Sequence, residues 1–299
     1  MTRCLQTTGQ GYFEEVTYDN PPIFGPTDIH VKSVMTGVCR SDIDMMLGNF
    51  GPLPLNMQGH EGLAQVIAVG NQVTNIKSGD YVATRGEPAY ADSYYVREHE
   101  YVKVPEAHPR YILEPVACGI NLIDQAKVYL DLKQGVESKM IILGSGFLAW
   151  VAYHTMRLNG FIFQVDVLGS SNLDLWKDKL LLGTTESYDV VVDISGKYDL
   201  GTDINLNNNA LVIDAVGKPT NKKEAEHLLW KACTTIRPSP RNPEFINCMH
   251  YAKHWIENGY LEVDHFWTRG YNRDTEWQQA FADGKDRPDG YSRGYIKWD

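Results

Sequence analysis

Residues 139–160 read KMIILGSGFLAWVAYHTMRLNG, and this stretch decides the fold of the second half of the chain. It begins with a short apolar run, turns at two glycines, and continues with apolar residues at helical spacing up to Gly160. Gly144 allows a tight turn, Gly146 lets a phosphate approach the backbone, and Ala149 permits close packing of the helix on the strand. This order predicts a pyrophosphate site that faces the N-terminus of the helix, with Phe147 and Leu148 in its first turn.

Three further apolar runs follow this stretch. They are FIFQVDVLG at 161–169, YDVVVDIS at 188–195 and ALVIDAVG at 210–217. Continuous apolar strands that alternate with helices belong to a parallel sheet covered on both faces. We therefore expect an α/β domain over residues 118–239, with a doubly wound parallel sheet of the Rossmann type that binds a dinucleotide.

The turn after the second strand of this sheet bears on the choice of cofactor. In this motif class an acidic residue at the strand end holds the ribose hydroxyls, but here the strand ends in Gly169, Ser170 and Ser171. Asp166 lies within the strand, before its end, and could be either a ribose contact or an ordinary strand residue. Because small hydroxyl residues tolerate a 2′-phosphate, we expect these three residues to contact NADP(H), with NAD(H) still possible.

The first hundred residues have a different pattern, with short strands rich in Val and Tyr that are broken by Gly, Pro, Asn and Asp. This pattern predicts a small, mostly antiparallel, barrel-like domain over residues 1–117. Helical spacing begins near Glu114, so we place the domain boundary within that helix. A tail over residues 240–299 is too short to fold alone, and we expect it to pack back on the first domain.

Composition excludes several classes of protein. The chain has 299 residues and 43% hydrophobic residues, enough for two domains. Its 28 basic and 38 acidic residues give a net charge of −10, so nucleic acid is not an expected partner. The first thirty residues lack the apolar core of a signal peptide, and no apolar run reaches the roughly 18 residues of a membrane span. We expect a cytoplasmic protein that does not contact the membrane, with its five scattered cysteines reduced.

Candidate metal ligands stand in three segments of the first half. GVCRSD at 37–42 contains Cys39, GHEG at 59–62 contains His60, and LEP at 113–115 contains Glu114. Thiolate, imidazole and carboxylate are the ligand types of a catalytic zinc, which keeps three protein ligands and one open position. Taken singly, Cys39 could be a small buried apolar residue, His60 a hydrogen-bonded loop residue, and Glu114 a carboxylate at a helix N-terminus.

Taken together, these segments resemble the zinc-containing medium-chain dehydrogenases, the family of alcohol, sorbitol and threonine dehydrogenases. The matching stretches are GVCRSD, GHEG, VIAVGNQVTNIKSGDYV, EPVACGI, GSGFLA and YDVVVDISG, in the order of the family. The resemblance implies a GroES-like catalytic domain, split between residues 1–117 and 240–299, around the Rossmann domain. It places Cys39 and His60 on the first two zinc ligands and Glu114 on the third, while Glu61 is the adjacent carboxylate that binds zinc in some members.

The resemblance also implies roles and partners. Ser41 falls where the family has the hydroxyl that takes the substrate proton, and Arg40 where some members contact the cofactor pyrophosphate. The expected substrate is a small alcohol, polyol or amino alcohol. A hydride would pass from it to the nicotinamide within a cleft that excludes water. A homodimer or homotetramer is the expected assembly.

Several departures from the family pattern leave alternatives open. No cysteines are present to bind a second, structural zinc, and Asp44 stands where many members have the His that completes the proton relay. The cofactor domain is shortened between Lys179 and Tyr188. A zinc-free reductase of the same fold and a non-catalytic dinucleotide-binding protein are therefore the alternatives. His250 and His254, with Cys248 nearby, more closely fit a solvated helix face than a metal pair.

Overall fold

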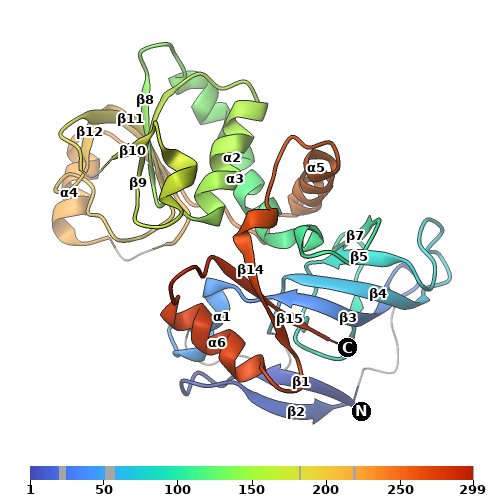
Figure 1. Ribbon diagram of the computed structural model, residues 1–299. Coiled ribbons are helices and arrows are strands. Elements are labelled where there is room, and N and C mark those ends of the chain that lie inside the picture. Colours follow the sequence, from blue (N-terminus) through green and yellow to red (C-terminus); the bar gives the residue numbers. More distant parts are fainter. Residues whose placement is uncertain (20–24, 51–57, 182, 218–219, 299) are drawn as a thin grey trace. The chain divides into compact units, whose positions relative to one another are not determined.

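The computed structural model describes residues 1–19, 25–50, 58–181, 183–217 and 220–298, and it divides the chain into two compact units (Figure 1). The first unit contains Met1–Ala117 and Ile246–Asp299, and the second contains Cys118–Phe245. The domain bounds predicted from the sequence place the return to the first domain at residue 240, six positions before the return at Ile246 that the structure shows.

A seven-stranded sheet forms the centre of the first unit. Its strand order is β14-β15-β3-β4-β5-β7, and β6 also pairs with β3. All of these pairs are antiparallel except β14 with β15. The strands are β3 (Ile29–Gly37), β4 (Gly62–Val69), β5 (Tyr81–Thr84), β6 (Ser93–Val96), β7 (Tyr101–Val104), β14 (Trp267–Asn272) and β15 (Arg293–Lys297).

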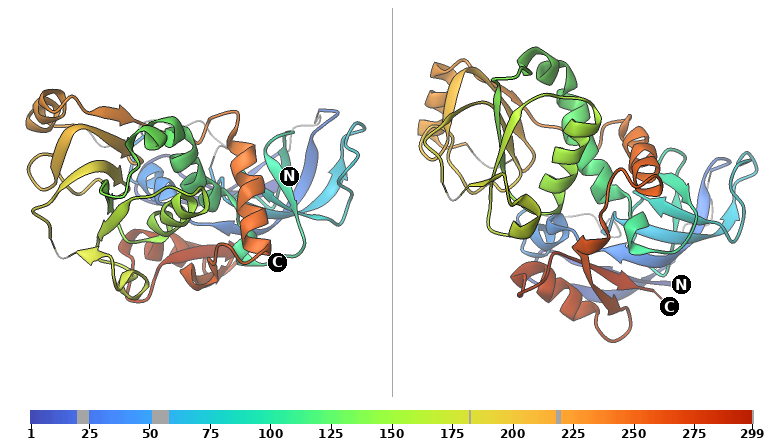
Figure 2. Two further views of the ribbon diagram at one scale, coloured as in Figure 1. Left: turned by 90° about the horizontal axis from the view of Figure 1, so that it is seen from above. Right: turned by 45° about the horizontal axis from the view of Figure 1, so that its top comes forward.

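The returning C-terminal segment is built into this unit. Strand β15 pairs with β3, and helix α6 (Trp277–Asp286) packs against α1 (Arg40–Met46). Strands β1 (Thr2–Gln6) and β2 (Glu14–Tyr18) form a separate antiparallel hairpin in this unit. Figure 2 marks the two ends of the chain, both of which belong to this unit. The shared core of these elements contains Leu5, Phe13, Ile43, Tyr90, Tyr271, Phe281 and Trp298. Burial of this aromatic core explains why the tail packs here.

The second unit contains a six-stranded parallel sheet in the order β10-β9-β8-β11-β12-β13. The strands are β8 (Lys139–Leu143), β9 (Gln164–Leu168), β10 (Leu180–Leu181), β11 (Ser187–Asp193), β12 (Asn205–Asp214) and β13 (Thr234–Ile236). This is the doubly wound sheet that the sequence predicts, and together with the antiparallel sheet of the first unit it confirms the predicted fold class.

Alternate residues of these strands face opposite sides of the sheet, and each side has its own core. On one side Met140 and Ile142 pack with residues of α2 (Glu114–Lys133) and α3 (Phe147–Leu158). On the other side Ile141 and Leu143 pack with Leu200 and Ile204. Helix α4 (Lys222–Trp230) follows β12. Burial on both faces explains why these strands read as continuous apolar runs.

The remaining elements of the described residues are one helix and three short 3₁₀ turns. They are α5 (Phe245–Glu257), η1 (Pro109–Tyr111), η2 (Leu173–Trp176) and η3 (Asp264–Phe266). Between Lys179 and Tyr188, where the sequence predicts a shortened cofactor domain, the described residues hold the two-residue strand β10 and the start of β11. Among the described residues, no helix has both the length and the apolar character needed to cross a bilayer.

Candidate metal and cofactor sites

Three potential metal ligands come together where β3 ends and β4 begins, in the sheet of the first unit. Cys39 is the N-cap residue of α1, and His60 and Glu61 directly precede β4. One ligand atom from each of them lies within 4.8 Å of the others. Among the described residues this is the one group of three or more metal-ligating side chains. Strands β3 and β4 pair side by side, which brings positions 39 and 60 together.

The Glu61 carboxylate is buried and only partly satisfied. Its side chain is 0% exposed, and Oε2 forms an ion pair with Arg293 of β15. The other oxygen, Oε1, has no hydrogen-bond partner. An added Cβ at Gly37 would lie 2.0 Å from Glu61 Oε2, so glycine leaves the room that this carboxylate occupies. A buried oxygen without a partner is costly, and a divalent cation between the thiol, the imidazole and this oxygen would satisfy it. The residues present therefore fit a metal ion of the zinc type.

A second carboxylate, that of Asp42, lies next to the Nδ1 side of the His60 ring. Asp42 Oδ1 lies 3.7 Å from His60 Nδ1. Its Oδ2 accepts hydrogen bonds from the Tyr90 hydroxyl at 2.7 Å and from the Cys39 backbone N–H at 3.0 Å. A carboxylate on the far nitrogen of a ligating histidine fixes the orientation and tautomer of the ring.

Burial and neighbouring charges shift the pKa values of the titratable side chains at this site. Burial raises the pKa of the Asp42 carboxyl group, although the charge of His60 and the bond from Tyr90 act to lower it. For His60, burial alone would lower the pKa, but the charge of Asp42 and the hydrogen bond with Cys39 raise it well above its ordinary value. Burial and the charge of Glu61 raise the pKa of the Cys39 thiol. A bound cation would compete with protons for these groups, because metal ligands bind in their deprotonated form.

The other residues predicted for this site lie around it. Glu114 begins α2 and is buried, and its charge acts on His60, but it is not in the group of ligand atoms within 4.8 Å. Ser41 Oγ lies 3.4 Å from His60 Nε2. Arg40 forms an ion pair with Asp44 at 3.5 Å, so Asp44 meets a cation where the family pattern has a histidine.

The glycine-rich turn of the second unit has the predicted shape. Gly144 has a φ of +127°, which favours glycine, and Gly146 is the N-cap residue of α3. Phe147 and Leu148 begin the helix, as predicted. A Cβ added to Gly146 would meet only the Ser171 hydroxyl, at 3.8 Å. The protein therefore leaves space next to the N-terminus of α3, where the backbone can accept a diphosphate.

The turn after β9 is tied to the glycine-rich turn by hydroxyl groups. Ser145 Oγ donates to the Ser171 carbonyl at 2.5 Å and accepts from the Ser171 N–H at 2.9 Å. The indole N–H of Trp176 donates to the Ser145 carbonyl at 3.0 Å. Ser170 and Gly169 belong to the same turn, and Gly169 lies against Ser145. These bonds hold the predicted cofactor residues of both turns in one place.

Asp166 is engaged elsewhere. Its Oδ2 accepts a hydrogen bond from the Tyr188 hydroxyl at 3.0 Å. The interpretation of Asp166 as an ordinary strand residue is thus the one that its contacts favour, and no carboxylate stands at the tip of β9 in positions 169–172.

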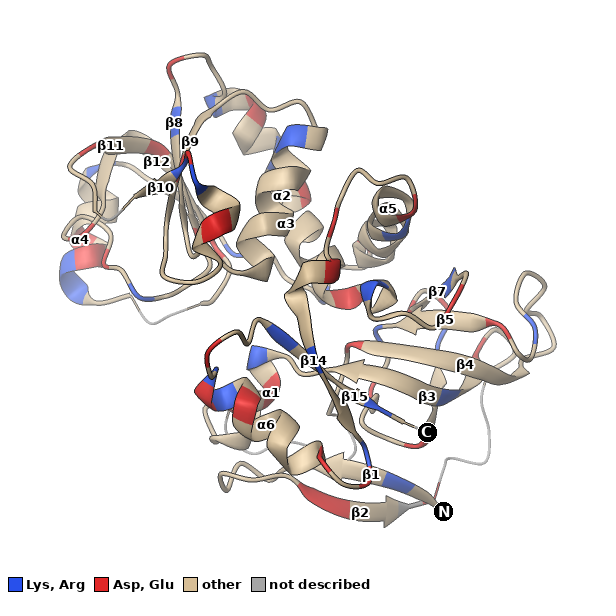
Figure 3. Ribbon diagram, viewed as in Figure 1, with Lys and Arg blue, Asp and Glu red and all other residues tan. Residues whose placement is uncertain are grey.

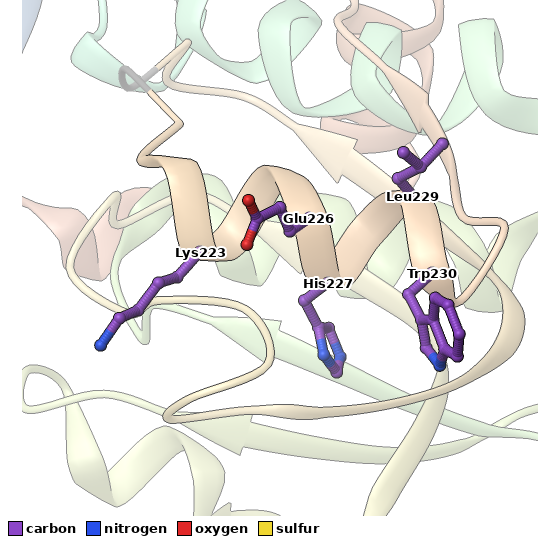
Figure 4. Close-up of a pocket in the computed structure, with 5 residues that line it drawn as sticks. All are labelled: Lys223, Glu226, His227, Leu229 and Trp230. Atoms are coloured by element: carbon purple, nitrogen blue, oxygen red, sulfur yellow. The ribbon is translucent and has the colours of Figure 1, made fainter.

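Other candidate features stay apart from these sites. His250 and His254 of α5 belong to no group of three metal ligands among the described residues. A shallow hollow on α4 is lined by Lys223, Glu226, His227, Leu229 and Trp230 (Figure 4). All five come from a single helix, and Lys223, His227 and Trp230 project from one side of it. This hollow therefore lacks the converging polar groups of a binding site.

Three residues of the metal site were not found from the sequence. Asp42, Tyr90 and Arg293 each contact a predicted ligand or its neighbour. Asp42 stands within the quoted stretch GVCRSD, so its position three residues after Cys39 was an available signal. Arg293 and Tyr90 carry no local signal, because only the pairing of distant strands brings them to the site.

Comparison with known proteins agrees with this description. Residues 25–109 match the alcohol dehydrogenase GroES-like domain. The mitochondrial enoyl-[acyl-carrier-protein] reductase of Homo sapiens is 33% identical over 112 residues, 36% of this chain and 30% of that protein. The D-xylulose reductase of Scheffersomyces stipitis is 42% identical over 84 residues, 26% of this chain and 23% of that protein. The chain thus matches about a third or less of the length of these relatives.

Among solved structures, S. aureus TarJ in complex with NADPH has a TM-score of 0.77 and 16% sequence identity, and the match covers 100% of this chain and 99% of that one. A parallel dinucleotide-type sheet joined to a GroES-like domain defines a class of dehydrogenases and reductases. The GroES-like match over residues 25–109 and the partial similarity to proteins named as dehydrogenases and reductases support the medium-chain dehydrogenase/reductase family, a family of oxidoreductases.

Proposed function

We propose that this protein is a zinc-dependent oxidoreductase that transfers a hydride between a small alcohol, polyol or amino alcohol and a nicotinamide cofactor. One observation carries the proposal. A thiol, an imidazole and a buried carboxylate present ligand atoms within 4.8 Å of one another, and the carboxylate has an oxygen without a hydrogen-bond partner.

Cys39, His60 and Glu61 would hold a single zinc ion, and Glu114 is the other candidate for the third ligand. When bound, zinc would act as a Lewis acid on the substrate oxygen and lower the pKa of the alcohol. Glu61 is favoured over Glu114 because its carboxylate is the one within 4.8 Å of both other ligands. No second, structural zinc is proposed.

The protein's own side chains would orient the ligands and move the proton. Asp42 would favour the orientation of the His60 ring by its charge, since its Oδ1 atom lies 3.7 Å from Nδ1 and forms no hydrogen bond with the described residues. Ser41 would take the substrate proton, since its hydroxyl lies 3.4 Å from His60 Nε2 at the edge of the ligand group. Arg293 balances the charge of Glu61.

We propose that the cofactor is held by the glycine-rich turn and the turn after β9. Gly144, Gly146, Phe147 and Leu148 would contact the diphosphate. Gly169, Ser170 and Ser171 would contact the adenosine ribose, and Arg40 would add a positive charge. NADP(H) is favoured over NAD(H) because the tip of β9 carries hydroxyl groups and no carboxylate, and the similar TarJ structure contains NADPH.

Replacement of the ligands tests the proposal. Cys39→Ser and His60→Ala should each abolish bound zinc, measured by elemental analysis, and turnover on a panel of alcohols, polyols and amino alcohols. Circular dichroism should remain that of the folded protein. Cys233→Ser is the matched control, since Cys233 is a half-buried thiol of the second unit, and it should retain both zinc and activity. Full activity in metal-free protein would overturn the proposal.

The third ligand is tested by two conservative variants. Glu61→Gln should release zinc, whereas Glu114→Gln should retain it and change mainly the environment of His60. The reverse result would assign the third position to Glu114. Cofactor binding measured by calorimetry without turnover on any substrate would instead favour a non-catalytic dinucleotide-binding protein.

A zinc-free reductase of the same fold is the second candidate. It is favoured by the relative named as an enoyl-[acyl-carrier-protein] reductase, whose name refers to reduction of an enoyl group rather than to an alcohol. NADPH oxidation with an enoyl thioester by protein that contains no metal would support this candidate. The expected homodimer or homotetramer is a separate proposal, and light scattering of the purified protein would test it.

A further inference from the structure

Tyr90 lies in the loop between β5 and β6, outside the motifs that carry the three candidate metal ligands. The residue is 0% exposed. Its ring packs edge-on against two phenylalanines, with 5.8 Å between the ring centroids for Phe13 and 5.3 Å for Phe281. The aromatic core of the first unit therefore fixes the ring, and with it the position of the Tyr90 hydroxyl group.

The hydroxyl group of Tyr90 contacts the segment that carries Cys39. It donates to Asp42 Oδ2 at 2.7 Å, and it lies 2.9 Å from the carbonyl oxygen of Gly37. The same Asp42 oxygen accepts the backbone N–H of Cys39 at 3.0 Å. The two contacts lie on either side of Cys39 in the sequence, so the hydroxyl group holds the turn from β3 into α1 on which this thiol stands.

The backbone at Tyr90 contacts the segment that carries His60. The Tyr90 N–H donates to the Gln58 carbonyl at 3.3 Å, and the Ala89 N–H donates to the Gly59 carbonyl at 2.8 Å. Gly59 has a φ of +79°, and a Cβ added to it would lie 2.6 Å from the Tyr90 nitrogen, so only glycine allows the two segments to approach this closely. Tyr90 thus connects the segment of the thiol with the segment of the imidazole.

The Asp42 carboxylate depends on this hydroxyl group because it has few other donors. Strand β4 carries no charged residue along its length (Figure 3), and β3 carries one, Lys32. The Asp42 side chain is 0% exposed, and its Oδ1 has no hydrogen-bond partner among the described residues. Its Oδ2 accepts from the Tyr90 hydroxyl and the Cys39 N–H. Loss of the hydroxyl group would remove one of two donors to a buried carboxylate.

We propose that Tyr90 is a positioning residue that holds the segments of Cys39 and His60 in the geometry that binds a metal ion. It contacts neither the ion nor the substrate, and it acts through Asp42, whose Oδ1 lies 3.7 Å from His60 Nδ1. Groups that orient metal ligands in this way contribute about 10- to 100-fold to metal affinity. The inference rests on the proposed function only for the identity of the metal, since the contacts that carry it are all within this chain.

Tyr90→Phe tests this role, because it keeps the ring in the core and removes only the hydroxyl group. Tyr188→Phe is the matched control, since Tyr188 is also 0% exposed and its hydroxyl donates to the carboxylate of Asp166 at 3.0 Å in the second unit. Zinc affinity is measured by competition with a chelator, and the visible spectrum of the Co²⁺-substituted protein reports the coordination geometry. Hydrogen exchange at the Cys39 amide of the metal-free protein reports the same contacts without a metal.

Tyr90→Phe should lower the zinc affinity by about 10- to 100-fold, change the Co²⁺ spectrum and speed exchange at the Cys39 amide by about 10-fold, whereas Tyr188→Phe should match the wild type in all three. Unchanged exchange at the Cys39 amide, or a zinc affinity equal to that of Tyr188→Phe, would overturn the inference. If the wild type binds neither zinc nor Co²⁺, the proposed function fails, and the exchange rate of the Cys39 amide alone then decides the role of Tyr90.

Discussion

The two candidate sites are built from different materials. In the first unit, the candidate metal site consists of buried and half-buried polar side chains from distant segments, namely Cys39, Asp42, His60, Glu61 and Arg293. In the second unit, the cofactor turn lies within residues 144–176 and consists of backbone groups and hydroxyls. The candidate metal site depends on ion pairs between its side chains. The cofactor turn depends on the conformation of its backbone.

This difference predicts different sensitivities to mutation. Removal of one partner from a buried ion pair leaves an uncompensated charge, which is one of the costliest changes to a folded protein. Removal of one hydroxyl from a turn costs a single hydrogen bond. A set of substitutions ordered by their expected effect can therefore confirm or reject the comparison.

The largest effect is expected from Arg293→Met in metal-free protein. This change leaves the buried Glu61 carboxylate without its cation and should lower the free energy of unfolding by about 3–5 kcal/mol. Urea denaturation at neutral pH measures it. The double variant Glu61→Gln with Arg293→Met should recover most of the loss. If Arg293→Met is as stable as the wild type, the ion pair between Arg293 and Glu61 does not contribute to the stability of the fold.

Gly146→Val should act on binding and not on stability. The new side chain would fill the space at the N-terminus of α3, so the affinity for NADPH should fall by about 100-fold or more, measured by fluorescence titration. Gly183→Val is the control, because a Cβ at Gly183 meets no atom within 4 Å. Equal NADPH affinity in the two variants would show that the cofactor does not bind at this turn.

Asp283 tests whether the first unit responds to acid. Burial alone would raise the pKa of this carboxyl group, but hydrogen bonds from Tyr271, Gln279 and Arg269 lower it. The carboxylate therefore stabilises the fold above its unfolded pKa of about 3.9, and this contribution is lost as the pH falls through the folded pKa.

Asp283→Asn should lower the free energy of unfolding by about 2 kcal/mol at pH 7, and the difference from the wild type should shrink toward pH 3. Urea denaturation at the two pH values measures this. Asp286→Asn, an exposed change at the same end of α6, should have little effect at either pH. A constant difference between Asp283→Asn and the wild type at both pH values would contradict the lowered pKa of Asp283.

The smallest effect is expected from Ser145→Ala. The variant loses the bonds between Ser145 and Ser171 and should lower the free energy of unfolding by about 1 kcal/mol. Hydrogen exchange at the Ser171 amide should become faster. Unchanged exchange would mean that Trp176 alone holds the turn through its bond to the Ser145 carbonyl.

The sequence predicted what depends on local patterns. The strand, glycine turn and helix at 139–160 determine their own conformation, because each part follows from neighbouring residues. The ligand types Cys39 and His60 could also be proposed from short motifs. Their convergence with Glu61 is a consequence of the pairing of β3 with β4, which the sequence does not state directly.

The rest depends on tertiary contacts. Arg293 reaches Glu61 only because β15 pairs with β3, and nothing near position 293 indicates this partner. The Tyr90 hydroxyl reaches Asp42 in the same way. The role of Asp166 was left open by the sequence, and it depends on Tyr188 in the adjoining part of the second unit. Long-range pairs of this kind have no periodic signal.

The pairing of β15 with β3 also has a consequence for the order in which the protein matures. During synthesis, Cys39, His60 and Glu61 leave the ribosome long before Arg293 does. Until β15 docks, the nascent ligands lack the cation that balances Glu61 in the finished fold. The charge balance of the three candidate ligands is therefore complete only after the last strand of the chain has docked.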